Sequence, residues 1–253
     1  MSTQIETFAH RLGQREAIMG TFLKTPSPII CEVLGLSPLD VICLDAEHAP
    51  FGRLDTDACI SQLRHADLPS LVRVAEDSAT EIRNALDAGA TGLLVPHVTS
   101  AQQAKQIVKL AHFGEGGRGF AGSTRAAHFT TRKMPDHIRH SAIETTIVLQ
   151  IEDLAALEQV DEIAAVEGVH ALFIGRADLA VAMGCGVNDE QVITAVKDIC
   201  SICNQHNRAV GMFTPNVDEI DMWRELGASF FLLSSDHAFL LQGARALKEI
   251  LKT

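Results

Sequence analysis

The feature that most constrains the fold is a regular alternation of short apolar runs with longer amphipathic segments. The apolar runs have the length of strands and are apolar throughout, which is typical of parallel strands covered by helices on both faces. They lie near residues 17–23, 40–45, 70–74, 92–96, 146–152, 170–175, 209–213 and 229–234. The amphipathic segments that favour helices lie near 4–13, 54–66, 78–89, 101–112, 154–166, 189–206, 217–226 and 237–251. This order predicts an α/β fold with a parallel sheet.

Two architectures fit this order, a (β/α)8 TIM barrel and a doubly wound open sheet, and 253 residues suit the barrel. Polar residues end the second, third, fifth and sixth runs. A closed barrel gathers these ends around one mouth, whereas an open sheet spreads them along an edge, so we predict the barrel. No Gly/Ser/Pro-rich linker divides the chain, which indicates one domain over residues 1–253. Segment 113–145 is expected to form an extended loop on the same mouth.

The composition of the chain excludes some classes of binding partner. A net charge of −11 argues against a nucleic acid or an anionic membrane as partner, because either requires a basic face. No apolar run reaches the roughly 20 residues that cross a bilayer, and no signal-peptide pattern begins the chain. The six cysteines are scattered, mostly within apolar segments, which is typical of reduced thiols. These features predict a cytoplasmic protein without a membrane partner.

The second apolar run ends in three groups that can move protons or bind a metal, Asp45, Glu47 and His48. An Asp that accepts a hydrogen bond from one imidazole nitrogen makes the other nitrogen a better base, so Asp45 and His48 are candidate catalytic residues. Glu47 either faces this site or faces solvent. Arg73 stands inside a strand, where a charge is rare unless it is paired or lines a pocket. It can clamp a carboxylate, or form an ion pair with Asp45 or Glu47.

Two acidic residues follow neighbouring strands, Glu152 after the fifth and Asp178 after the sixth. Each alone is best explained as a helix cap; together at one mouth they favour a site for Mg²⁺ or Mn²⁺. Gln150 shares the interior face with Glu152 and either contacts the substrate or is a buried structural amide. Of the seven lysines, all but Lys24 fall in helices or outer loops, which disfavours a Schiff-base mechanism.

Several motifs, in this order along the chain, resemble the HpcH/HpaI aldolases. They are Leu44-Asp-Ala-Glu-His-Ala-Pro-Phe51, Arg73-Val74, Leu86-Asp-Ala-Gly-Ala90, Val95-Pro96, Gln150-Ile-Glu152 and Phe173-Ile-Gly-Arg-Ala-Asp-Leu179. The resemblance runs from about residue 20 to residue 240. It implies a (β/α)8 barrel that assembles as a homohexamer, a trimer of dimers that exchange C-terminal helices. It also implies a class II aldolase that reversibly cleaves a 4-hydroxy-2-oxo acid, either a 2-keto-3-deoxy sugar acid or a hydroxy-oxo diacid, to pyruvate and an aldehyde through a metal-stabilised enolate.

The resemblance assigns roles to individual residues. It implies that Glu152 and Asp178 bind Mg²⁺ or Mn²⁺, with Co²⁺ as a further candidate ion, and that His48, supported by Asp45, transfers protons. Arg73 would stabilise the pyruvate enolate. Gln150 and the backbone amides near Ala177 and Asp178 would bind substrate, and Phe213 and Thr214 are expected to line the pocket. The chain departs from the family at three positions, Ala49, His97 and Arg176.

Two other functions remain open. An acyl-CoA lyase of the citrate lyase β or malyl-CoA type would share the barrel and the acidic pair, but no basic, adenine-stacking segment for CoA is evident. A non-catalytic binding barrel would leave the strand-end residues unexplained.

Overall fold

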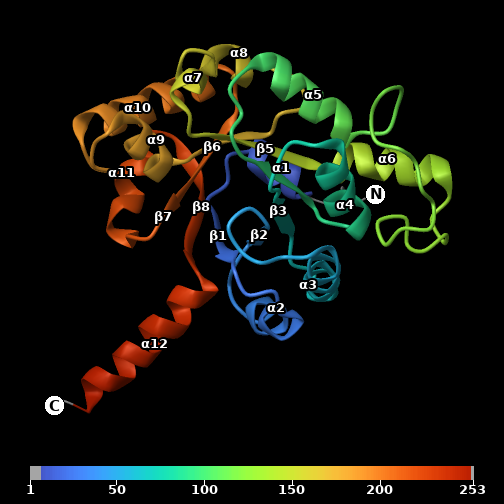
Figure 1. Ribbon diagram of the computed structural model, residues 1–253, viewed down its shortest axis with the longest axis horizontal. Coiled ribbons are helices and arrows are strands. Elements are labelled where there is room, and N and C mark those ends of the chain that lie inside the picture. Colours follow the sequence, from blue (N-terminus) through green and yellow to red (C-terminus); the bar gives the residue numbers. More distant parts are fainter. Residues whose placement is uncertain (1–6, 252–253) are drawn as a thin grey trace.

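The computed structural model describes residues 7–251, and its eight parallel strands close into a barrel in sequence order (Figure 1). The predicted (β/α)8 barrel is therefore confirmed. The strands are β1 (Ile18–Leu23), β2 (Val41–Asp45), β3 (Ser70–Arg73), β4 (Gly92–Val95), β5 (Thr146–Ile151), β6 (Ala171–Ile174), β7 (Ala209–Thr214) and β8 (Ala228–Ser235). Each predicted strand corresponds to one of these within a few residues. The continuous apolar runs arise because nearly all strand residues are buried, with Met19 on β1 and Phe213 on β7 as exposed residues and the end of β8 half-buried.

The helices form the outer layer. They are α1 (Phe8–Gly13), α2 (Pro28–Gly35), α3 (Arg53–His65), α4 (Ala79–Ala88), α5 (Ala101–Ala111), α6 (Met134–Glu144), α7 (Leu154–Leu157), α8 (Val160–Ala164), α9 (Arg176–Met183), α10 (Glu190–Gln205), the 3-10 helix η1 (Val217–Glu219), α11 (Ile220–Glu225) and α12 (Asp236–Ile250). The prediction missed α2, α6 and α9, and the helix expected over 154–166 is two short helices. Residues 4–6 of the first expected helix lie outside the described residues. Among the described helices, none is both long and apolar enough to span a membrane.

The core has two layers that follow from the alternation of side chains along each strand. Outward-facing residues such as Ile42, Leu149 and Leu172 pack beneath the helices. Inward-facing residues such as Cys43 and Phe173 fill the barrel. Helix α1 closes the end of the barrel at which the strands begin.

Segment 113–145 does not lie on the mouth at which the strands end, so this prediction is wrong. The Arg125 guanidinium donates to the Asp57 carboxylate on α3 at 2.6 Å, and the Ala126 amide donates to the Asp87 carbonyl near the end of α4 at 3.3 Å. Helix α4 ends where β4 is about to begin, so the segment covers the amino-terminal end of the barrel. The chain reaches that end because α5 runs back along the barrel after β4.

Candidate functional site

Every second side chain of a strand points into the barrel, and at the ends of several strands these inward-facing side chains are polar and lie at the mouth. On β2 the inward series ends in Asp45, and on β3 it ends in Arg73, which is the register partner of Asp45. On β5 the inward series continues through Gln150 to Glu152. Cys43 and Val148 are the apolar members of these series below the mouth. The fold thus turns the sequence pattern of apolar residues followed by a charge into one ring of polar groups.

A buried ion-pair network centres on Asp45, whose side chain is fully buried. Its Oδ1 accepts hydrogen bonds from Nε and Nη2 of Arg73 at 3.0 and 2.8 Å, and its Oδ2 accepts from Lys24 Nζ. Burial alone would raise the pKa of Asp45, but the charges of Arg73 and Lys24 hold it below its ordinary value. The guanidinium of Arg73 also stacks 4.5 Å above the Phe22 ring. Arg73 is therefore a rigid cation at the mouth.

His48 lies beside this network, but its ring is not paired with Asp45. The Asp45 carboxylate accepts a hydrogen bond from the His48 backbone amide at 3.1 Å instead. The His48 Nε2 atom lies 3.4 Å from Glu47 Oε2, and the imidazole is 59% exposed. The expected orienting contact from Asp45 to the ring is thus absent, and Glu47 is the carboxylate that faces it. The sequence had left the direction of Glu47 open; its side chain is only 9% exposed and points into the site.

Glu152 is the most buried carboxylate on the opposite side of the mouth. Its Oε1 accepts a hydrogen bond from the His97 backbone amide at 2.9 Å, and its Oε2 accepts one from the Gln150 side-chain amide. Burial raises the pKa of Glu152, and the nearby charge of Asp178 adds to that effect. The Oε1 atom of Gln150 is buried and has no hydrogen-bond partner. Such an orphaned oxygen beside a buried carboxylate is what a site for a cation or a substrate hydroxyl leaves when unliganded.

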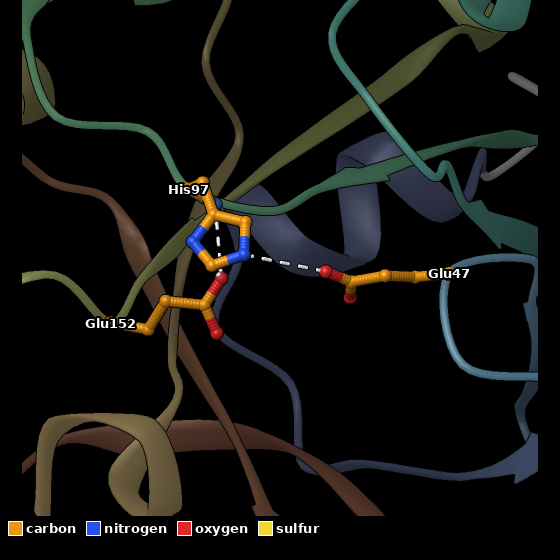
Figure 2. Close-up of side chains that lie close together, drawn as sticks. All are labelled: Glu47, His97 and Glu152. Atoms are coloured by element: carbon orange, nitrogen blue, oxygen red, sulfur yellow. Dashed lines mark hydrogen bonds and ion pairs between the residues drawn. The ribbon is translucent and has the colours of Figure 1, made fainter. Parts of the chain in front are cut away.

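The His97 imidazole lies between the carboxylates of Glu47 and Glu152, as Figure 2 shows. Its Nε2 is 3.5 Å from Glu47 Oε1, and its Nδ1 is 3.4 Å from Glu152 Oε1 and 3.0 Å from Asp153 Oδ2. His97 adopts a left-handed backbone with φ of 55°, which is uncommon for a residue other than glycine. One ligand atom from each of Glu47, His97 and Glu152 lies within 4.8 Å of the others. These three residues can therefore share a metal ion.

The first turn of α9 brings Ala177 and Asp178 to the mouth. Both are exposed, and backbone amides in the first turn of a helix lack intrahelical partners, so they can bind an anion. Asp178 is not within the group of three possible ligands, although its charge acts on Glu152. Arg176, a departure from the family pattern, is held by a residue of η1, which follows β7. It is 6% exposed and binds Glu219 at 2.7 Å while its guanidinium stacks on Trp223.

Phe213 and Thr214, which were expected to line the pocket, differ in how exposed their side chains are. Phe213 is 36% exposed and its ring centroid lies 5.8 Å from that of Phe22, so it forms part of the mouth. Thr214 is fully buried, and its hydroxyl donates to the Asn216 carbonyl at 3.0 Å. Its side chain is therefore engaged in holding the loop after β7.

Sequence reasoning underweighted two residues. His97 was named only as a departure from the family pattern, although it follows β4 closely and so obeys the same strand-end pattern as the others. Lys24 was considered only as a Schiff-base candidate, although it directly follows β1 and contacts Asp45. Applying the strand-end pattern to all eight strands would have found both residues.

Comparison with known proteins agrees with this geometry. The chain is 32% identical to a hydroxypyruvate/pyruvate aldolase of Paraburkholderia phytofirmans, with 99% of each chain covered. It is also 32% identical to a 5-keto-4-deoxy-D-glucarate aldolase of Klebsiella pneumoniae, covering 97% of this chain and 96% of the relative. A crystal structure of an HpcH/HpaI aldolase/citrate lyase family protein from Burkholderia cenocepacia superposes with a TM-score of 0.91 at 31% identity, covering 97% of this chain and 98% of the other. The family model described as HpcH/HpaI aldolase/citrate lyase matches residues 18–242, and the chain belongs to this family.

Proposed function

We propose that the protein cleaves a 4-hydroxy-2-oxo acid into pyruvate, or a close analogue such as hydroxypyruvate, and an aldehyde, and that it catalyses the reverse addition. Family membership makes the chain a carbon–carbon lyase of the aldolase type. The observation that carries the proposal is a fixed cation, Arg73, facing a buried carboxylate, Glu152, across a mouth that also holds two imidazoles. The activities for which the two relatives are named define the substrate class to be tried first.

The donor set fits a divalent metal ion. Glu152 is buried, the adjacent Gln150 has an orphaned oxygen, and His97 adds a nitrogen. We propose that Glu152 and Asp178 hold the ion, with His97 and Glu47 near enough to contribute. Oxygen ligands suit Mg²⁺ and Mn²⁺, and an imidazole shifts the preference towards Mn²⁺ or Co²⁺. When bound, such an ion would withdraw electron density from the keto oxygen of the substrate.

The protein side chains account for the remaining steps. His48, exposed and beside Glu47, takes the proton from the C4 hydroxyl as the C3–C4 bond breaks. The Nη1 atom of Arg73 makes no hydrogen bond within residues 7–251, which leaves it available for the negative charge that develops on the departing fragment. The amides at the start of α9 orient the substrate carboxylate. Phe213 borders the space where the aldehyde end would lie.

The test is pyruvate release from a panel of 4-hydroxy-2-oxo acids that includes 5-keto-4-deoxy-D-glucarate. The purified protein is assayed as isolated, after EDTA treatment, and after Mg²⁺, Mn²⁺ or Co²⁺ is restored. Activity that EDTA removes and metal restores supports the proposal, and it is expected to fall at least about a hundredfold in Glu152→Gln and His48→Ala. Activity that is indifferent to EDTA contradicts the metal site. Cleavage of acyl-CoA substrates alone would move the assignment to the citrate lyase branch of the family.

We also propose that copies of the chain associate through α12, within the hexamer that the family resemblance implies. Helix α12 projects away from the barrel (Figure 1) and exposes an apolar face. Its exposed large apolar residues are Phe239, Leu240, Leu241, Leu247 and Ile250. Contiguous apolar surface of this kind is usually buried by a partner. Light scattering tests this: Leu240→Asp with Leu247→Asp is expected to lower the oligomeric state, and an unchanged mass would contradict association through α12.

A further inference from the structure

A cavity lies at the opposite end of the barrel from the mouth. It has a volume of about 360 Å³, within the range of small-molecule sites. Its floor is formed by residues that precede β3, β4 and β5, such as Pro69, Thr91 and Thr145, and α6 closes one side. Leu68 and Leu86 are among its apolar wall residues. None of the residues assigned to the proposed aldolase site lines this cavity.

Three arginines line this cavity, Arg64, Arg118 and Arg132. Within residues 7–251, none of the three has a carboxylate oxygen within 4.0 Å, in contrast to six other arginines, such as Arg73 and Arg125, which form ion pairs. Two carboxylates, Asp67 and Glu144, also line the cavity, and Glu144 lies 3.3 Å from His140 outside it. The arginines outnumber these acids, in a chain whose net charge is −11. Among the lining residues the arginines therefore exceed the acids by one, while the Asp87 carboxylate, which is not a lining residue, also acts on Arg118.

Arg118 is the most informative of the three because it is only 5% exposed. Its guanidinium stacks 3.9 Å from the Phe113 ring, and its Nη2 donates to Ser141 Oγ at 2.9 Å, while its Nε is buried without a partner. Burial lowers the pKa of Arg118 to about 10. The charge of the more distant Asp87 carboxylate offsets only part of the effect of burial on Arg118, and a buried guanidinium without a directly paired anion is rare.

His137, on α6, adds two more unpartnered nitrogens to the same wall. It is 2% exposed, its ring packs 5.2 Å from that of Phe113, and neither Nδ1 nor Nε2 has a hydrogen-bond partner. Buried polar atoms are almost always satisfied in native proteins. Four features therefore coincide here: a cavity, unpaired guanidinium groups, an unsatisfied imidazole and the hydroxyl groups of Ser141 and Thr145. A bound anion would accept hydrogen bonds from the guanidinium and hydroxyl groups that line the cavity, whereas the buried nitrogens of His137 have almost no surface open to it.

We infer that this cavity binds a small anion carrying two or more carboxylate or phosphate groups, at a site separate from the aldolase mouth. Guanidinium groups recognise both kinds of group through paired hydrogen bonds, so the two share one recognition chemistry. Arg118 and Ser141 form the inner end of the site, and Arg64 and Arg132 bind from its rim. The inference does not depend on the chemistry at the mouth, because no residue is shared.

Thermal denaturation and calorimetry test the inference with three probes, pyrophosphate, inorganic phosphate and succinate, against chloride at equal ionic strength. The protein is treated with EDTA so that anions do not bind through a metal. At least one probe is expected to raise the Tm, since a ligand that binds only the folded state stabilises it. A larger rise in Tm with pyrophosphate than with succinate would indicate that the cavity prefers phosphate groups, and the reverse would indicate that it prefers carboxylates.

Site-directed variants test whether the anions that raise the Tm bind in this cavity. Arg118→Gln and Arg132→Gln are expected to weaken binding at least about tenfold. Arg139→Gln is the matched control, because Arg139 lies on α6 but is 67% exposed and pairs with Asp136. Should Arg118→Gln fail to fold, Arg132→Gln and Ser141→Ala provide the same comparison. The inference is overturned if no probe raises the Tm, or if the cavity variants and Arg139→Gln respond equally, since the anion would then bind elsewhere.

Discussion

Replacing Asp45 by Asn tests the electrostatic arrangement at the mouth most directly. Asparagine keeps the shape of the side chain but removes the charge that pairs with Arg73 and Lys24. The buried Arg73 would then keep only Glu47 Oε2, at 3.3 Å, as an anionic contact within the described residues. Removing one partner of a buried ion pair costs about 3–5 kcal/mol. Since a protein of this size loses about 2–4 °C of Tm per kcal/mol, the Tm is expected to fall by roughly 6–20 °C.

The measurement is urea unfolding at pH 7 and at fixed protein concentration, because association also contributes to stability. Asp57→Asn is the matched control. Asp57 also pairs with an arginine, Arg125, at 2.6 Å, but its side chain is 42% exposed. An exposed pair contributes about 0–1 kcal/mol, so this control should lose little. Equal losses in the two variants would refute the reasoning that burial makes the Asp45 network costly to break.

The loss of stability in Asp45→Asn should also depend on pH. The folded-state pKa of Asp45 is lowered, mainly by Arg73 acting against the effect of burial. A carboxyl with a lowered pKa contributes stability that is present above its unfolded pKa of about 3.9 and is lost as the pH falls through the folded value. The difference in stability between the wild type and Asp45→Asn should therefore narrow on acidification below about pH 4. A difference that stays constant or widens would show that the charge of Asp45 is not its cause.

Three further predictions concern the neighbouring elements. Gly175→Ala would place a Cβ 2.7 Å from Glu152 Cβ and 2.8 Å from its Oε2, so we expect a Kd for Mn²⁺ at least about tenfold weaker by calorimetry, with the fold retained in circular dichroism. Arg176→Leu leaves Glu219 without its 2.7 Å partner and should cost about 1–3 kcal/mol in urea unfolding; no loss would show that the pair is dispensable. Borohydride with pyruvate should leave the mass of the protein unchanged, because Lys24 is held in an ion pair. A covalent adduct on Lys24 would overturn this.

The strands were predictable because burial on both faces leaves a signal in every one of them. Helix α6 was not predicted, because it lies in a segment whose Gly, Arg and His content is typical of a loop, although Pro135 in its first turn is a signal for a helix start. The position of this segment followed from topology, not from residue type: a helix that follows a strand reverses the chain direction, so residues beyond α5 return to the amino-terminal end. Counting these reversals would have placed segment 113–145 correctly.

At the site, residue type and strand position predicted which side chains meet but not how they pair. The ion pair between Asp45 and Arg73 was one of the two possibilities left open, and it follows from their register in adjacent strands. The partner of the His48 ring depends on the conformation of the turn after β2, which places the backbone amide of His48, and not its ring, against Asp45. Such turn geometry has no sequence signature as strong as the alternation within a strand.

The pairing at the mouth also explains why a metal ion suits the site. Among the side chains there, Asp45, Glu47, Glu152, Asp153 and Asp178 are acidic, whereas Lys24 and Arg73 are basic and are already paired with Asp45. The acids exceed the bases by three charges, and one divalent cation would balance two of them. An anionic oxo acid approaching this mouth without that cation would meet net repulsion from Glu47 and Glu152. The unpaired arginines of the opposite cavity present the reverse situation, since they attract an anion without any metal. The two ends of one barrel therefore favour anions by different means, one through an added cation and the other through its own side chains.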